Sequence, residues 1–78
     1  MTHDKFRIAS KMITEFEKAS KKFPDFHSRH EGYAVIKEEL DEVWDAIRSN
    51  DREQAMVEMI QVGAMAIRFI QNLHDKNI

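Results

Sequence analysis

The sequence predicts an all-α fold, in which a three-helix protomer assembles into an oligomeric bundle of the four-helix type. Apolar residues recur at steps of three and four along nearly the whole chain, which is the period of a helix. Only two glycines and one proline are present, so there is little material for turns. With 78 residues, 42% of them hydrophobic and 33% charged, the chain is predicted to form a single domain over residues 1–78.

The first helix is expected at about residues 2–23. Its apolar residues follow the helical period, and lysines and glutamates fill the other face. Pro24 is expected to end this helix, because proline disfavours α geometry in the residue that precedes it. The apolar positions are Phe6, Ala9, Met12, Ile13, Phe16, Ala19 and Phe23.

The second helix is expected at about residues 29–49. Ser28 followed by Glu31 matches a capping box, which marks a helix start. "SND" at residues 49–51 should end the helix, and either Asn50 or Asp51 can cap the next one. The apolar seam, which we expect to pack in the core, consists of Tyr33, Ile36, Leu40, Val43, Trp44 and Ile47.

The third helix, at about residues 52–74, is apolar over most of its circumference and should therefore be buried on several sides. Two partner helices of this size cannot easily cover it, so we expect a homodimer or homotetramer whose third helices share a core. Gly63, Ala64 and Ala66 would allow close approach of helices. Between Ala55 and Leu73 the clearly polar residues are Glu58, Gln61, Arg68, Gln71 and Asn72.

Composition and charge exclude several classes of function. The net charge is −2 and no basic cluster is present, so we expect no nucleic-acid partner. No apolar stretch is long enough for a membrane span, and the charged N-terminus lacks the apolar segment of a signal peptide. The absence of cysteine rules out disulfides and thiolate metal sites. These features together predict a cytoplasmic protein.

The second helix concentrates negative charge in "EELDE" at residues 38–42. Like charges three or four residues apart on a helix repel each other, and a bound cation would relieve that repulsion. A helical wheel places Glu39 and Glu42 beside the apolar seam, where a bundle would partly bury them, whereas Glu38 points further toward solvent.

Glu58 and Gln61 form a second polar pair on the third helix. Counted from the turn near Asn50, Glu42 lies about eight residues back and Glu58 about eight residues forward. Because helices joined by a short turn run antiparallel, the two pairs should come level. Oxygen ligands of this kind favour Mg²⁺ or Mn²⁺. The predicted ligands are Glu39, Glu42, Glu58 and Gln61.

These motifs resemble the MazG-like, all-α nucleotide pyrophosphohydrolases, whose signature is E-E-x-x-E on one helix and E-x-x-D on the next. "EELDE" matches the first half, and "EMIQ" at residues 58–61 follows after a gap of fifteen residues in the place of the second. The flanks "HEGYAVIKEELDEVWD" and "QVGAMAIRFI" look like small or phage-type members of the family. The chain departs from the signature at Gln61, whose neutral amide replaces an aspartate and brings less charge to a metal ion.

The resemblance implies a Mg²⁺-dependent nucleoside triphosphate pyrophosphohydrolase that releases nucleoside monophosphate and pyrophosphate. Catalysis would fall to Glu38, Glu39 and Glu42, one of them acting as general base. From their chemistry, Arg68 and Lys37 are candidates to contact phosphate. The alternative is a non-catalytic MazG-like helical protein that binds metal or nucleotide weakly, or acts through a protein partner. A plain coiled-coil module would need no acidic cluster, and the carboxylates would then be a solvated face.

Overall fold

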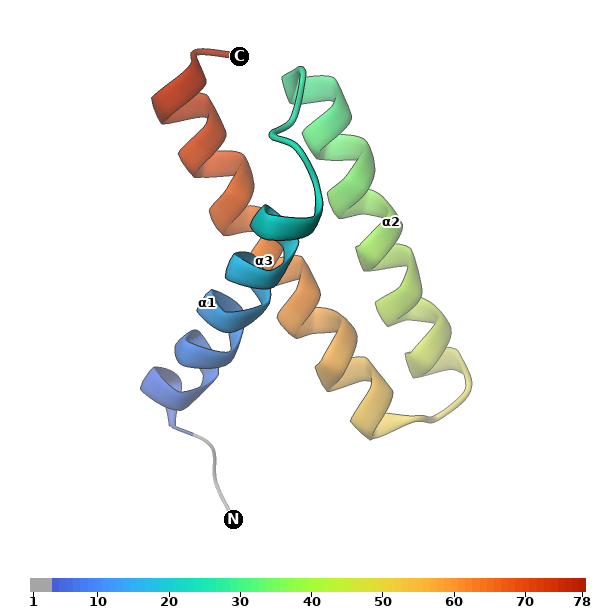
Figure 1. The fold of residues 1–78 in the computed structure, drawn as a ribbon. Helices are drawn as coiled ribbons and strands as arrows, with labels where there is room; N and C mark the ends of the chain where they lie inside the picture. Colours follow the sequence, from blue (N-terminus) through green and yellow to red (C-terminus); the bar gives the residue numbers. More distant parts are fainter. Residues whose placement is uncertain (1–3) are drawn as a thin grey trace.

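The structure, a computed structural model, describes residues 4–78 and contains the three predicted helices (Figure 1). Over these residues there is no strand, so the all-α prediction is confirmed for the protomer. The helix ends lie within a few residues of the expected ones, and the expected start at Thr2 falls outside the described residues. The helices are α1, Lys5–Lys22; α2, Arg29–Arg48; and α3, Arg52–Lys76.

The expected cap forms at the start of α2. The Ser28 hydroxyl oxygen accepts a hydrogen bond from the Glu31 backbone N–H at 3.1 Å. The Glu31 carboxylate accepts one from the His27 N–H at 2.8 Å, one residue before the position of a standard capping box. At the end of α1, Phe23 adopts an extended conformation, as a residue before proline should.

The α2–α3 connection is a tight turn built on Asn50, whose φ of 60° lies in the left-handed region. The Asp51 N–H donates to the Ala46 carbonyl at 2.9 Å and the Asn50 N–H donates to the Ile47 carbonyl at 3.0 Å, which together form a Schellman motif. Asp51 then caps α3 by accepting the Gln54 N–H at 3.0 Å. This turn sets the register between α2 and α3.

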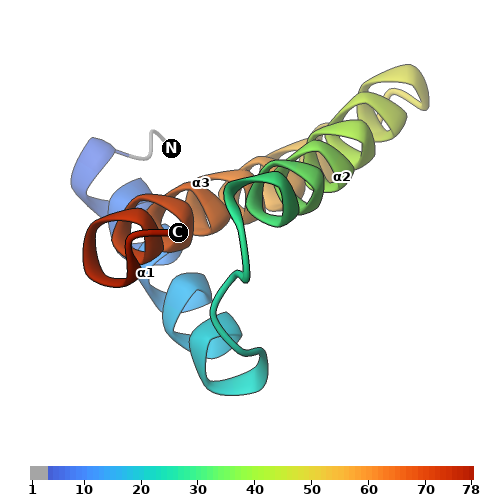
Figure 2. The same ribbon diagram turned by 90° about the horizontal axis from the view of Figure 1, so that it is seen from above.

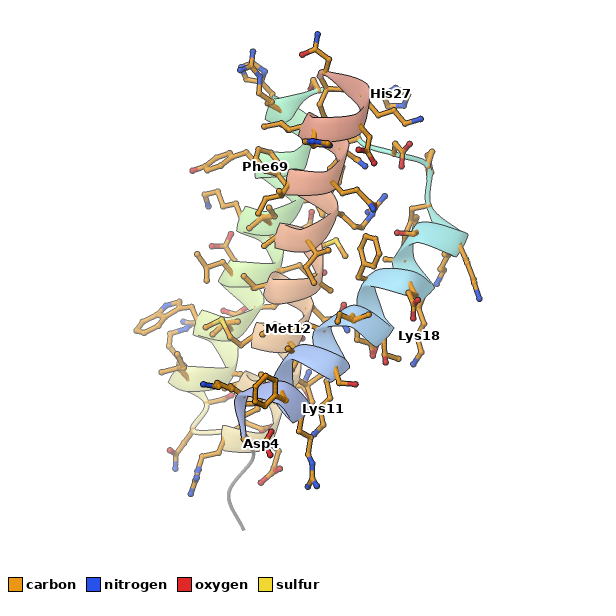
Figure 3. All side chains as sticks on the ribbon, turned by 90° about the vertical axis from the view of Figure 1, so that its left-hand side faces the viewer. Asp4, Lys11, Met12, Lys18, His27 and Phe69 are labelled. Carbon is orange, nitrogen blue, oxygen red and sulfur yellow. The ribbon has the colours of Figure 1, made fainter. Side chains whose placement is uncertain are left out.

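α3 is the central helix, and it contacts both α2 and α1. α2 runs antiparallel beside it, while α1 crosses it on the side away from α2 (Figures 1 and 2). The small residues of α3 serve this packing within one chain. Ala64 is fully buried, and a Cβ at Gly63 would meet the Met12 side chain of α1, which reaches α3 in Figure 3.

The α1–α2 connection contributes to the core. Phe26 is buried against Ala64 and Met65, and its backbone N–H donates to the Asn72 side-chain oxygen at 2.8 Å. Arg68 Nη2 donates to the Pro24 carbonyl at 2.7 Å, and its guanidinium lies 4.6 Å from the centre of the Phe26 ring. Both polar side chains are buried, so they anchor the connection onto α3.

Most of the apolar seam of α2 is exposed in the protomer, so its expected place in a core stays a prediction. Tyr33, Leu40, Trp44 and Ile47 are all exposed, and Val43 is the one seam residue that is fully buried. The physical reason is the placement of α1, which covers α3 on the far side and leaves this flank of α2 without a neighbour.

Two glycines at helix contacts should respond differently to alanine. A Cβ at Gly32 would lie 2.5 Å from Phe69 Cδ1 and 3.2 Å from Phe26 Cδ2, atoms of rigid rings. We expect Gly32→Ala to lower the free energy of unfolding by about 1–3 kcal/mol in urea titrations. Gly63→Ala should cost less, because the Met12 side chain is flexible and can move away from the new methyl group. Equal losses in both variants would contradict this reasoning.

Candidate metal centre

Three glutamates from two helices converge on the flank of the α2–α3 hairpin. Glu39 and Glu42 come from α2 and Glu58 from α3, and each offers a carboxylate oxygen within 4.8 Å of the other two. Glu39 and Glu42 are one turn apart on the same side of α2, because three residues span most of a helical turn. The turn at Asn50 brings Glu58 level with them, as the residue count from that turn suggests.

The site is electrostatically strained in the absence of a cation. Burial raises the pKa of Glu39 to about 7, and the charges of Glu42 and Glu58 add to this effect. The pKa of Glu42 is raised chiefly by the charge of Glu58, with a further contribution from burial. Glu39 and Glu58 are half-buried, whereas Glu42 is exposed rather than partly buried as the wheel suggested. The three carboxylates therefore cannot ionise together without cost.

A divalent cation with oxygen ligands fits this arrangement. Mg²⁺ holds its ligands at about 2.1 Å, so oxygens that share one ion lie at most about 4.2 Å apart. The carboxylates are close to that separation, and small rotations would complete it. The Gln54 amide donates to Glu58 Oε2 at 3.0 Å and so helps to orient one ligand. The donor set is all oxygen and carries three formal charges, which suits Mg²⁺ or Mn²⁺.

Gln61, the fourth predicted ligand, is half-buried and faces a different part of the molecule. It lines an open cavity of about 640 Å³ between α1 and α3, together with apolar side chains that include Met12 and Ile60. Glu58 does not belong to the lining of this cavity. Gln61 as a ligand therefore stays a prediction.

The two candidate phosphate contacts point away from the carboxylates. Arg68 follows Glu58 by ten residues, or about 15 Å along a helix, and it is buried with the Pro24 carbonyl as its partner. Lys37 is exposed, forms an ion pair with Asp41 at 3.2 Å, and lies about 140° around α2 from Glu42. Neither position favours a shared phosphate site. Glu38 is exposed, one turn before Glu42 on the same side of α2.

Sequence reasoning missed the roles of Gln54, Arg68 and Asn72. Gln54 precedes Glu58 by four residues, a spacing that could have suggested their hydrogen bond. Arg68 and Asn72 are polar residues on a largely apolar helix, and both are turned under the α1–α2 connection. Their burial depends on the path of that connection, which no spacing on α3 reveals.

Comparisons of the chain with protein-family models, with curated proteins and with solved structures found no match. Among the helices of residues 4–78, none is both long and apolar enough to cross a membrane.

Proposed function

We propose that the protein is a Mg²⁺-dependent nucleoside triphosphate pyrophosphohydrolase, with Mn²⁺ as a possible substitute. The observation that carries this proposal is the convergence of Glu39, Glu42 and Glu58 from two helices onto one small volume. The motif spacing that resembles the MazG-like family supports the same reaction. So does the raised pKa of Glu39, because perturbed carboxylates cluster at functional sites.

In the proposed reaction Glu39, Glu42 and Glu58 would hold the cation, which would lower the pKa of a water molecule and offset the charge of the triphosphate. Glu38 is exposed on the same side of α2 as Glu42, which supports assigning it to take the proton of the attacking water. Glu58 is kept in orientation by the Gln54 amide. Attack on the phosphoryl group next to the nucleoside then gives nucleoside monophosphate and pyrophosphate. We propose that the chain performs this reaction as a homo-oligomer.

A second candidate function is that of a non-catalytic helical protein, which binds metal or nucleotide weakly or works through a protein partner. Gln61 favours this reading, because it brings no charge and lines the cavity between α1 and α3. The positions of Arg68 and Lys37 favour it as well, because both point away from the carboxylates. Under this reading a cation would stabilise the fold without turnover.

The decisive experiment measures pyrophosphate release from a panel of nucleoside triphosphates, with Mg²⁺ and with a chelator. We expect release with Mg²⁺ and none with the chelator, and we expect Glu42→Gln to lose at least about a hundredfold in rate. A protein that Mg²⁺ stabilises against heat but that releases no pyrophosphate from any nucleotide would establish the non-catalytic function instead.

A further inference from the structure

The first helix, α1, is a basic element in a chain whose net charge is negative. It holds six of the chain's twelve lysines and arginines but only two of its fourteen acidic residues, Glu15 and Glu17. The formal charge of α1 is therefore +4, whereas the net charge of the whole chain is −2. Because the cations are spread over residues 5–22, the sequence shows no basic run, and only the helix aligns them.

Five of these six cations form a stripe along the side of α1 that faces away from α3. At 100° per residue they fall within a sector about 100° wide, and about 22 Å of helix separates the first from the last. We call this group the α1 basic stripe, and it consists of Arg7, Lys11, Lys18, Lys21 and Lys22. Met12 and Phe16, which pack toward α3, lie about 150° around the helix from the middle of the stripe. Figure 3 shows Lys11 and Lys18 on the opposite side of α1 from Met12.

The cations of the stripe are exposed and have few partners. Lys18 lies 3.7 Å from a carboxylate oxygen of Glu15, a surface contact of the kind that contributes little to stability. The other four cations form no ion pair with any residue in the range 4–78. Glu17 is exposed beside the stripe but outside its sector. An anionic surface could therefore approach these cations without first displacing a protein carboxylate from most of them.

Exposed apolar side chains border the stripe. Phe6 is 76% exposed and Ile13 is 49% exposed. They are seven residues apart, so they lie nearly in line, about 60–80° around the helix from Lys21. Phe23, just after the last turn, is also exposed, and the Nζ atom of Lys22 lies 5.5 Å from the centre of its ring. A helix that presents cations beside aromatic and aliphatic groups is suited to the boundary between lipid headgroups and acyl chains.

The acidic residues of α2 lie on the other side of the molecule. Among the described helices, α1 packs against α3 and not against α2, which runs along the far side of α3 (Figure 2). Two interhelix spacings of about 8–10 Å each therefore separate α1 from α2, whereas the Debye length at physiological ionic strength is about 8 Å. An anionic surface in contact with the stripe is attracted by α1, while salt screens it from most of the repulsion by the carboxylates of α2.

We propose that the α1 basic stripe, together with Phe6 and Ile13, attaches the protein to an anionic phospholipid surface. The cations contact the charged headgroups, and the two apolar side chains enter the boundary with the acyl chains. The apolar flank favours lipid over nucleic acid, because a phosphate backbone attracts the cations but gives Ile13 no apolar surface to bury against. Attachment of this kind needs no membrane-spanning helix, and the inference is independent of the proposed enzymatic activity.

Co-sedimentation with lipid vesicles tests the proposal. At about 0.1 M salt we expect binding to phosphatidylcholine vesicles that contain about one-third phosphatidylserine. Binding to vesicles of pure phosphatidylcholine should be at least about tenfold weaker, and about 0.5 M salt should release most of the protein from the anionic vesicles. Equal binding to both kinds of vesicle, or no binding to the anionic ones, would overturn the proposal.

The double variant Arg7→Gln/Lys21→Gln tests the stripe itself. Each cation near an anionic surface contributes about fivefold in affinity, so removing two should weaken binding to the anionic vesicles about 25-fold. Glutamine suits a helix about as well as lysine or arginine does, so α1 should stay folded. The matched control is Arg29→Gln/Arg48→Gln, which changes the net charge equally on exposed positions of α2 and should bind within about twofold of the parent. If the two double variants bind alike, the stripe is not the contact and the proposal is refuted.

Phe6→Ser separates a lipid surface from other polyanions. It keeps all five cations of the stripe and removes an exposed side chain, so the fold should be unchanged and binding to the anionic vesicles should fall about tenfold. A vesicle affinity that this variant leaves unchanged would contradict the insertion of the apolar flank. Binding to a single-stranded oligonucleotide of about twenty bases is measured in parallel. An oligonucleotide that binds more tightly than the anionic vesicles, and that depends on Arg7 and Lys21, would assign the stripe to nucleic acid and refute the proposal.

Discussion

Glu39→Gln is expected to remove most of the stabilisation that Mg²⁺ gives and to make the metal-free protein more stable. Glu39 is half-buried, and its pKa of about 7 records the cost of ionising beside Glu42 and Glu58. A neutral amide of the same shape avoids that cost, which we place on the order of 1 kcal/mol after allowing for solvent screening. In the parent protein, Mg²⁺ at a hundred times its dissociation constant should add about 2.7 kcal/mol.

The measurement is thermal unfolding followed by circular dichroism, with chelator and with millimolar Mg²⁺. Glu42→Gln should also lose the response to Mg²⁺, with a smaller metal-free gain because Glu42 is exposed. Glu17→Gln serves as control, because it removes one exposed carboxylate from α1 and should leave the response intact. The metal-centre hypothesis fails if both α2 variants respond to Mg²⁺ like the parent.

The fold of the protomer was readable from the sequence because its signals are local. The step of three and four marks the helices, and Ser28, Pro24 and Asp51 mark their ends through hydrogen bonds to neighbouring residues. The convergence of Glu42 and Glu58 needed one further premise, that a short turn makes helices antiparallel. Glu42 and Glu58 each lie fewer than about ten residues from the turn, so counting residues from the turn was sufficient to predict that they come level.

The remaining features depend on contacts between segments far apart in the chain. Arg68 is a polar residue on a largely apolar helix, and it is buried because Pro24 and Phe26 pass over it. The sequence showed that Trp44 is apolar at a core-like position, but periodicity does not say whether the same chain or another copy covers it. Gln61 likewise faces α1 because of where α1 crosses α3, and the spacing from Glu58 carries no information on that crossing.

The last prediction is that pH changes the stability of the metal-free protein and its affinity for Mg²⁺ in opposite directions. In the unfolded chain Glu39 loses its proton near pH 4.5, whereas in the folded protein it keeps the proton until about pH 7. Between these values the folded state binds more protons, so the free energy of unfolding falls as pH rises and then levels off above pH 7. For this half-buried group we expect a fall on the order of 1–2 kcal/mol after solvent screening.

Mg²⁺ requires the ionised carboxylate, so its binding must displace the proton of Glu39 below pH 7. Its apparent dissociation constant should therefore rise about tenfold for each pH unit below that value.

Unfolding in urea at pH 5 and pH 8, with and without Mg²⁺, measures both effects. At pH 8 the metal should stabilise the protein strongly, and at pH 5 it should have little effect. Glu39→Gln isolates the contribution of this residue from that of the other titratable groups. If the parent and Glu39→Gln show the same pH dependence without metal, Glu39 does not hold a proton at neutral pH, and the crowding of the three carboxylates is weaker than their positions indicate.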